Sequence, residues 1–295
     1  MTSRTRAITL LCCGVVAAAT TSAGALAAES PLQAGLTLIG GVADDLLEGT
    51  PAADLIEGGE GDDTINGGGG NDTLRSGPGR DYATGGRGND QIDAGDDNDE
   101  VDGGEDEDAI GGGSGEDTIG GGEGNDVIDG GDGNDALDGG EGNDALDGGD
   151  GADEVEGGDG DDVLTVRGSG LDGDALLGGP GSDRIVGGNG PDALRGNEGD
   201  DSIKGRTSAD RIWGGPGDDR IFGEAGRDVL YGEAGDDTIT GGAGSDRVTA
   251  GAGKDTIRVA GGGRDRVNCG PGIDRVSADR RDVISSTCER VTRRR

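Results

Sequence analysis

A nine-residue repeat dominates this chain of 295 residues. When the sequence is written in rows of nine from Gly40, the sixth position of every row is Asp, beginning with Asp45. Two short insertions, Val166 to Gly168 and then Val259, shift the register, and the Asp column resumes after each and runs to Asp274. The eighth position is Leu, Ile or Val in every row but one, and the first, second and fourth positions are mostly Gly. A fixed period of this kind is the signature of an architecture in which each repeat stacks on its neighbours.

Each position of the repeat has a physical role. Glycine permits a positive φ and a close approach of the backbone to an ion, and the Asp supplies a carboxylate where the turn ends. The seventh to ninth residues are predicted to form a three-residue strand whose middle side chain points inward. One aliphatic side chain per repeat is then the whole predicted core. Because so small a core cannot offset the backbone entropy lost on folding, we expect a bound cation to supply the missing cohesion.

The identity of the cation follows from the ligands on offer. The chain contains no His, so carboxylate and carbonyl oxygens are the available donors. Oxygen ligands select a hard cation, and Ca²⁺ accepts them in more adaptable geometry than Mg²⁺ does. We therefore predict that the repeats bind several Ca²⁺ ions.

Several other functions are disfavoured by composition. Without His there is no Ser-His-Asp or Cys-His nucleophile system, no G-x-S-x-G elbow occurs, and neither Lys204 nor Lys254 completes a phosphate-binding loop. We predict that the protein is not an enzyme. A net charge of -37 repels nucleic acid and anionic membranes, so we expect no nucleic-acid partner and no membrane insertion.

The repeats resemble the RTX (repeats-in-toxin, haemolysin-type) calcium-binding nonapeptide repeats, whose pattern is G-G-x-G-x-D-x-U-x. The nine residues from Gly121 to Asp129 and those from Gly130 to Asp138 fit this pattern at every specified place, and the resemblance covers residues 40 to 277. It implies an all-β fold, a parallel β-roll (a β-solenoid) with two nonapeptides per coil, and Ca²⁺ held between turns that stack two repeats apart. Nothing in this chain matches the toxin, protease or lipase domains of many relatives, so the resemblance implies no cytolytic or hydrolytic activity.

The same resemblance implies which residues bind metal. Asp117, Asp135 and Asp153 would line one edge of the roll, and Asp126, Asp144 and Asp162 the other. The uninterrupted turns from Gly112 to Thr165 form the best block. The predicted calcium ligands are Asp63, Asp72, Asp81, Asp90, Asp117, Asp126, Asp135, Asp144, Asp153, Asp162, Asp183, Asp192, Asp219 and Asp237.

Some rows depart from the pattern. Asp97 and Asp106 replace Gly at the fourth position, so we expect the file of ions to break there. Asp45 and Asp54 are interpreted as structural remnants rather than ligands.

The chain divides into five predicted segments. Residues 1–27 have the features of a secretory signal peptide, so we predict a secreted, extracellular protein. A lead-in (28–39) precedes an acidic calcium-binding array (40–165), a charge-balanced array (166–277), and a C-terminal cap with a basic tail (278–295). Cleavage of the signal leaves Cys269 and Cys288, which we expect to form a disulfide in an oxidising compartment.

Charge separates the two arrays. Residues 29–166 carry 40 acidic and 3 basic residues, whereas residues 167–295 carry 22 and 20. Six arginines occupy the outward seventh position, where we expect them to neutralise the Asp of their own repeats: Arg184, Arg211, Arg220, Arg247, Arg266 and Arg275. We hypothesise that this half and its disulfide-closed end form a cap, partly independent of calcium, on which the acidic half folds.

The sequence thus predicts a secreted protein that folds on binding calcium. The alternative is a calcium-stiffened structural or adhesive spacer at the cell surface. Trp213 and Tyr231 should stack on one face, either as a sugar platform or as a shield for the backbone. The tail of Arg293, Arg294 and Arg295 suggests contact with an anionic surface or wall polymer, with a solvated chain end as the alternative.

Overall fold

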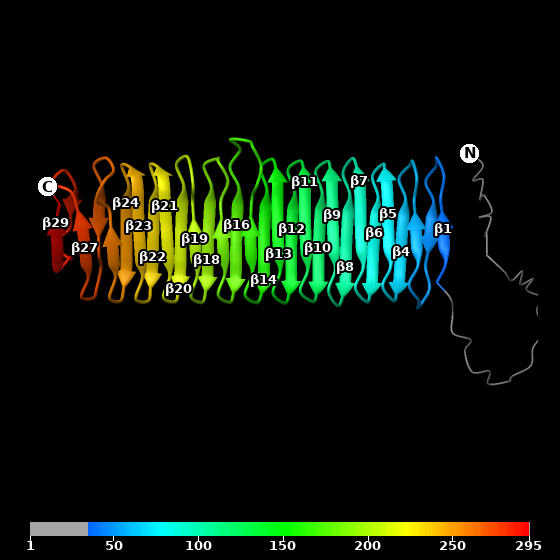
Figure 1. Cartoon of the computed structure of the whole chain (residues 1–295), viewed down its shortest axis with the longest axis horizontal. Helices are drawn as coiled ribbons and strands as arrows, with labels where there is room; N and C mark the ends of the chain where they lie inside the picture. The colour runs from blue at the N-terminus through cyan, green and yellow to red at the C-terminus, as the bar shows by residue number, and fades with distance from the viewer. Residues whose placement is uncertain (1–34, 295) are drawn as a thin grey trace, which may run out of the picture.

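A computed structural model describes residues 35–294, and every strand in it belongs to one of two parallel sheets. Odd-numbered strands form a 15-stranded sheet and even-numbered strands a 14-stranded sheet, here called the odd sheet and the even sheet. The chain alternates between them at every turn and forms a straight rod with β1 at one end and β29 at the other (Figure 1). There is no helix in the described part, and hence none long and apolar enough to cross a membrane.

The odd sheet consists of β1 (Thr37–Ile39), β3 (Leu55–Glu57), β5 (Thr73–Pro78), β7 (Gln91–Asp96), β9 (Ala109–Ser114), β11 (Val127–Asp132), β13 (Ala145–Asp150), β15 (Val163–Thr165), β17 (Arg184–Val186), β19 (Ser202–Lys204), β21 (Arg220–Gly226), β23 (Thr238–Gly244), β25 (Thr256–Arg258), β27 (Arg275–Ala278) and β29 (Arg290–Arg293). The even sheet consists of β2 (Leu46–Glu48), β4 (Thr64–Gly69), β6 (Tyr82–Arg87), β8 (Glu100–Glu105), β10 (Thr118–Glu123), β12 (Ala136–Glu141), β14 (Glu154–Asp159), β16 (Ala175–Pro180), β18 (Ala193–Glu198), β20 (Arg211–Pro216), β22 (Val229–Ala234), β24 (Arg247–Ala252), β26 (Arg266–Asn268) and β28 (Val283–Ile284).

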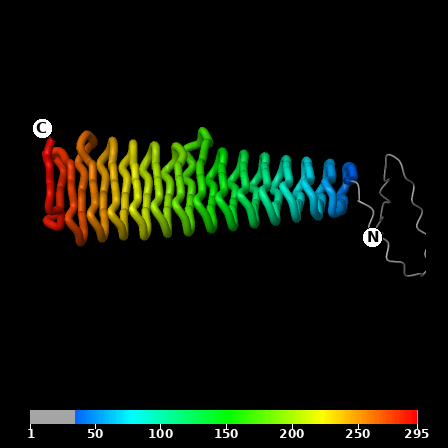
Figure 2. Tube along the Cα trace, turned by 60° about the horizontal axis from the view of Figure 1, so that its bottom comes forward, coloured from blue at the N-terminus to red at the C-terminus, as the bar shows by residue number. Residues whose placement is uncertain are grey.

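The pairing register confirms two repeats per coil. In the even sheet Ile119 of β10 lies beside Leu137 of β12, eighteen residues later, and Ile128 of β11 pairs in the same way with Leu146 of β13 in the odd sheet. The insertion after Val166 forms a loop that leaves the regular outline between β15 and β16 (Figure 2), and the strands on either side resume the pairing. The insertion therefore lengthens one turn without breaking the rod. The fold is the predicted parallel β-roll.

The core contains more than the eighth position. Eighth-position side chains such as Ile119 and Leu137 are buried between the sheets, as predicted. Some first-position residues point inward as well and join the core, as Ala94, Ala250 and Cys269 do. One aliphatic side chain per repeat is thus not the whole core.

The predicted three-residue strand is also too short for much of the rod. Strands β4 to β14 are six residues long because the glycines that follow one coil pair with those of the next, as Gly122 does with Gly140. This extra pairing satisfies backbone groups that the sequence alone placed in a turn.

The glycine pattern has two separate causes. At Gly112, a first-position glycine, a side chain would have to displace its neighbours: a Cβ there would lie 2.5 Å from both Asp117 Oδ2 and the carbonyl oxygen of Gly130. At the second and fourth positions the backbone is left-handed, with φ of +109° at Gly122 and +151° at Gly124. Asp97 adopts the same kind of conformation, with φ of 79°, so the turn there keeps its shape without Gly at some cost in strain.

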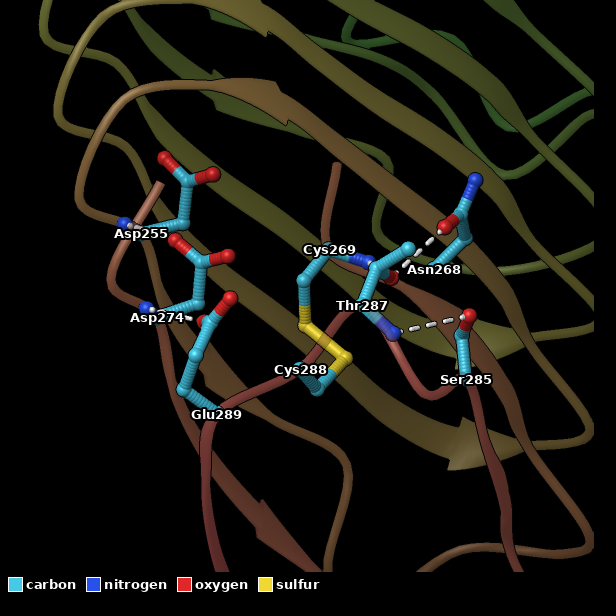
Figure 3. The surroundings of a disulfide bond; sticks show 8 residues. All are labelled: Asp255, Asn268, Cys269, Asp274, Ser285, Thr287, Cys288 and Glu289. Carbon is cyan, nitrogen blue, oxygen red and sulfur yellow. Dashed lines mark hydrogen bonds between the residues drawn. A yellow bond between two sulfur atoms is a disulfide. The ribbon is translucent and has the colours of Figure 1, made fainter. Parts of the chain in front are cut away.

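The C-terminal end is closed by the predicted disulfide. Cys269 and Cys288 are joined with their Cα atoms 5.2 Å apart, and Cys269 is fully buried. Beside the disulfide, the Cys269 N–H and the Thr287 hydroxyl make hydrogen bonds that fix the final loop (Figure 3). The predicted signal peptide and most of the lead-in lie outside the described residues.

Candidate metal sites

Two ladders of aspartates run along the two edges of the rod. The backbone N–H of each sixth-position Asp donates to Oδ1 of the Asp in the next coil, as in Asp117 to Asp135 (2.9 Å) and Asp126 to Asp144 (2.7 Å). One ladder starts at Asp45 and the other at Asp54, and neither is broken within residues 45–274. The side chains that we expected on each edge are therefore brought together, eighteen residues apart in sequence and one coil apart in space.

Each ladder uses only one of the two carboxylate oxygens. Oδ2 is buried and has no hydrogen-bond partner in 22 of these aspartates. All the predicted ligands except Asp192 belong to this group, together with nine ladder residues that were not predicted: Asp99, Asp108, Asp201, Asp210, Asp228, Asp246, Asp255, Asp265 and Asp274. A buried oxygen without a partner is costly, so each is a place where a cation would be stabilising.

Main-chain oxygens lie close to the orphaned carboxylate oxygens. A Cβ built on Gly139 would meet Asp144 Oδ2 at 2.5 Å and the carbonyl oxygen of Gly157 at 2.3 Å, so the two oxygens face one small space. Within residues 35–294 no three His, Cys, Asp or Glu side chains converge as a metal cluster. A cation held here would thus take one carboxylate per turn and complete its shell with carbonyl oxygens, a donor set that suits Ca²⁺.

Burial sets the protonation behaviour of the ladders. Burial raises the pKa of Asp108 to about 7 and that of Asp219 to about 8, and the backbone N–H received by each carboxylate offsets only part of the effect. Neighbouring carboxylates of the same stack raise these pKa values further. A bound cation acts in the opposite direction, because it favours the ionised form.

Three turns satisfy their own carboxylates. Gly188 N–H donates to Asp192 Oδ2 at 2.9 Å, and the N–H groups of Gly41 and Thr50 do the same for Asp45 and Asp54. In these turns the second Asp oxygen is already used. Asp192 therefore differs from the other predicted ligands, and Asp45 and Asp54 have the geometry expected of structural positions.

The aspartate ladders continue through the rows where we expected the file of ions to break. Asp99 and Asp108, the sixth residues of the two rows with Asp at the fourth position, accept and donate ladder bonds like their neighbours. Sequence reasoning excluded them because it required Gly at the fourth position. The column of aspartates places them in the same ladders as the predicted ligands.

Two residues that we did not predict end the ladders. Asp282 accepts the N–H of Asp265 at 3.1 Å and that of Asp279 at 2.5 Å. Glu289 accepts the N–H of Asp274 at 3.0 Å, in line with the stacked carboxylates (Figure 3). Asp282 follows Asp265 by seventeen residues and Glu289 is not an Asp, so the nine-residue period gives no signal for either.

The seventh-position arginines do not neutralise the ladders as we expected. Among the described residues the ion pairs are Arg75–Glu57, Arg87–Glu105, Arg167–Asp147 and Lys254–Asp236, and none joins a seventh-position Arg to a ladder Asp. The reason is the alternation of side chains along a strand: the seventh position faces outward, whereas the ladder Asp is buried at the edge.

The structure combines a parallel β-roll with buried aspartates of which one carboxylate oxygen is hydrogen-bonded and, in most turns, the other is not. This combination defines the class of calcium-binding β-roll repeat proteins. Comparison with protein families gives the same result, because the RTX calcium-binding nonapeptide repeat matches residues 39–74, 75–110, 111–146, 138–166, 177–206, 195–230 and 222–257. The chain belongs to this family, and its repeats are calcium-binding repeats in a structural scaffold. A comparison with curated proteins found no match.

Proposed function

We propose that this chain is a secreted protein that folds on binding several Ca²⁺ ions in its turns. The observation that carries the proposal is the buried Oδ2 without a partner, repeated in 22 ladder aspartates. Without a cation these carboxylates oppose folding through desolvation and mutual repulsion. With Ca²⁺ bound, the same groups hold neighbouring coils together, so the free energy of binding becomes free energy of folding.

Secretion is supported by the pattern of the first 27 residues and by the disulfide. Residues 1–27 have the charge and apolar pattern of a signal peptide. The Cys269–Cys288 disulfide is typical of an oxidising compartment. Calcium is scarce inside cells and abundant outside, so the chain would remain unfolded until export.

The test is a calcium titration of residues 28–295, followed by circular dichroism and by native mass spectrometry to count ions. We expect a large gain of β signal and several bound ions. The matched variants are Asp135→Asn, which changes a ladder carboxylate, and Asp132→Asn, which changes an exposed carboxylate of the same turn. Asp135→Asn should weaken binding, and Asp132→Asn should leave the ion count unchanged. A metal-free protein that is as folded as the calcium-loaded one would refute the proposal.

A second candidate function is a calcium-stiffened spacer at the cell surface. It is favoured by the rod itself, in which β1 and β29 lie at opposite ends (Figure 1). Pull-down of cell-wall material with and without a chelator separates the candidates, because a spacer retains a wall partner that a purely calcium-responsive protein lacks.

A further inference from the structure

The outer face of the odd sheet is strongly basic in its C-terminal half, although the whole chain is acidic. Strands β17, β19, β21, β23, β25, β27 and β29 contain a single acidic residue, Glu224. Their outward positions carry basic side chains that we define together as the basic face: Arg184, Lys204, Arg220, Arg258, Arg275 and Arg290. All are exposed except Lys204, which is half-buried.

These cations are stacked along the rod and have no carboxylate partner. Ser202 lies between Arg184 and Arg220 in neighbouring strands, and Arg275 lies directly beside Arg290. None of the basic-face residues takes part in an ion pair within residues 35–294. Arg275 and Arg290 repel each other because like charges lie directly beside one another, and the other basic-face side chains have no ion-paired carboxylate to offset their charge in the described part of the chain.

Two depressions lie at the ends of the basic face. The first has a volume of about 420 Å³. Its lining includes Arg184, Lys204 and Arg206 around the buried Val186, together with Glu224 and with Arg167, which is paired with Asp147 at 3.1 Å. Arg206 has a φ of 71° at a position that is Gly in most repeats, so a basic side chain is kept there despite backbone strain. The second has a volume of about 470 Å³ and is bordered by Arg258, Arg275, Arg290 and Arg294.

The chemistry between the depressions fits a hydroxylated, anionic chain. The outward positions that are not basic are mainly hydroxyl residues, among them Ser202, Thr238, Thr240 and Thr256. Guanidinium groups bind sulfate and carboxylate in a two-pronged manner, and the hydroxyls can exchange hydrogen bonds with sugar hydroxyls.

Other polyanions fit the basic face less well. Its one aromatic side chain, Phe222, is covered by the Lys204 ammonium 5.9 Å from the ring centre, so the stacking platform that single-stranded nucleic acid requires is missing. The flat face has no element to enter a duplex groove. Among the odd-sheet strands β17 to β29, Val291 is the one exposed large apolar side chain, and a single Val is too little for insertion into a lipid surface.

The acidic half does not prevent binding. Seven strands spaced by about 4.8 Å make the basic face about 30 Å long, whereas the screening length at physiological ionic strength is about 8 Å. A ligand on the basic face is therefore screened from most of the acidic array.

We propose that the basic face binds an anionic polysaccharide, with its sulfate or carboxylate groups in the two depressions. The inference adds a partner to the proposed calcium-binding rod and rests on that function only because calcium would keep the rod folded. The ligand is placed on a strand face, away from the aspartate ladders at the edges.

The experiment uses the full mature chain in millimolar calcium and physiological salt. Dextran sulfate is the anionic probe, neutral dextran is its matched control, and hyaluronan tests whether carboxylate can replace sulfate. Titration calorimetry should detect both anionic polymers and not neutral dextran. Affinity for dextran sulfate should fall as salt is raised, because binding releases counterions.

Two triple variants test whether binding depends on the basic face or only on the net charge of the chain. Arg184→Gln, Arg220→Gln and Arg275→Gln remove three outward arginines from the odd sheet. Arg211→Gln, Arg247→Gln and Arg266→Gln remove three from the same repeat position of the even sheet. The odd-sheet variant should bind dextran sulfate about tenfold more weakly, and the slope of its log affinity against log salt concentration should become shallower by about two. The affinity of the even-sheet variant should stay within about threefold of wild type.

Several outcomes would overturn the inference. An equal loss in both triple variants would mean that net charge alone drives binding, and a folded wild type that ignores both polymers would exclude the partner. Tighter binding of a DNA duplex or of anionic vesicles through the odd-sheet arginines would assign the face to another class of partner. Circular dichroism of each variant with and without calcium keeps these outcomes distinct from failure of calcium-dependent folding.

Discussion

The adjacent residues Gly120 and Gly121 provide a sharp test of the metal-site geometry. Gly121 is a first-position glycine, and a Cβ there would lie 2.4 Å from Asp126 Oδ2 and 2.6 Å from the carbonyl oxygen of Gly139. Gly120 is a ninth-position glycine outside the left-handed region, and a Cβ there would have no neighbouring atom within 4 Å. One methyl group moved by one residue therefore either enters the candidate site or points into open space.

The expected effects have opposite signs. Gly121→Ala forces apart the two oxygens that face the candidate site, which should cost about 1–3 kcal/mol as overpacking and should also weaken calcium binding at that turn. Gly120→Ala should be neutral or stabilise by about 0.4–1 kcal/mol, because it restricts only the unfolded chain.

Urea unfolding in saturating calcium measures the change in stability, and native mass spectrometry counts the ions bound by each variant. A lower midpoint and a lower ion count for Gly121→Ala alone are expected. If the two variants unfold together and bind the same number of ions, the inference that first-position glycines make room for metal ligands is wrong.

Three further predictions concern pH, the disulfide and the two arrays. Burial raises the pKa of Asp72 from 3.8 to about 6 and that of Asp219 from 3.8 to about 8. Between pH 3.8 and about 8 the folded metal-free rod therefore holds protons that the unfolded chain has released. The stability of the metal-free rod should accordingly fall as pH rises through this range. Calcium requires the ionised form, so melting curves with and without chelator should show its stabilisation growing from pH 6 to pH 8. Replacing Cys269 and Cys288 by Ser should destabilise the C-terminal end by about 3 kcal/mol in the loop-entropy account, which would lower the melting midpoint. Reducing the disulfide of the wild type should lower its midpoint to the same extent, whereas a reductant should not change the midpoint of the variant. Hydrogen exchange at rising calcium should protect residues 167–294 before residues 40–165, because the acidic array has far more repulsion to overcome; simultaneous protection would refute the cap hypothesis.

The residues themselves were enough to predict the repeat and most of the core, and the resemblance to the RTX repeats predicted the two edges. Each coil contacts only its neighbours, so the period of nine fixes the spacing of equivalent residues. The resemblance to the RTX repeats supplied the two repeats per coil, and the structure accordingly places Asp117 next to Asp135 and Ile119 beside Leu137. The choice of calcium also follows from the sequence, because donor chemistry depends on residue type rather than on exact position.

The stacked coils were needed to show how each carboxylate is used. The division of labour between Oδ1 and Oδ2 depends on a hydrogen bond from a residue eighteen positions away, and the self-satisfied turn at Asp192 depends on the backbone conformation at Gly188. The period is the same at both kinds of turn and cannot distinguish them. Arg184 was predicted to face outward and to neutralise the Asp of its own repeat; it does face outward, but no ion pair joins the two among the described residues. The alternation along a strand could be predicted from the sequence, but which groups come within reach of each carboxylate is decided only when the coils stack.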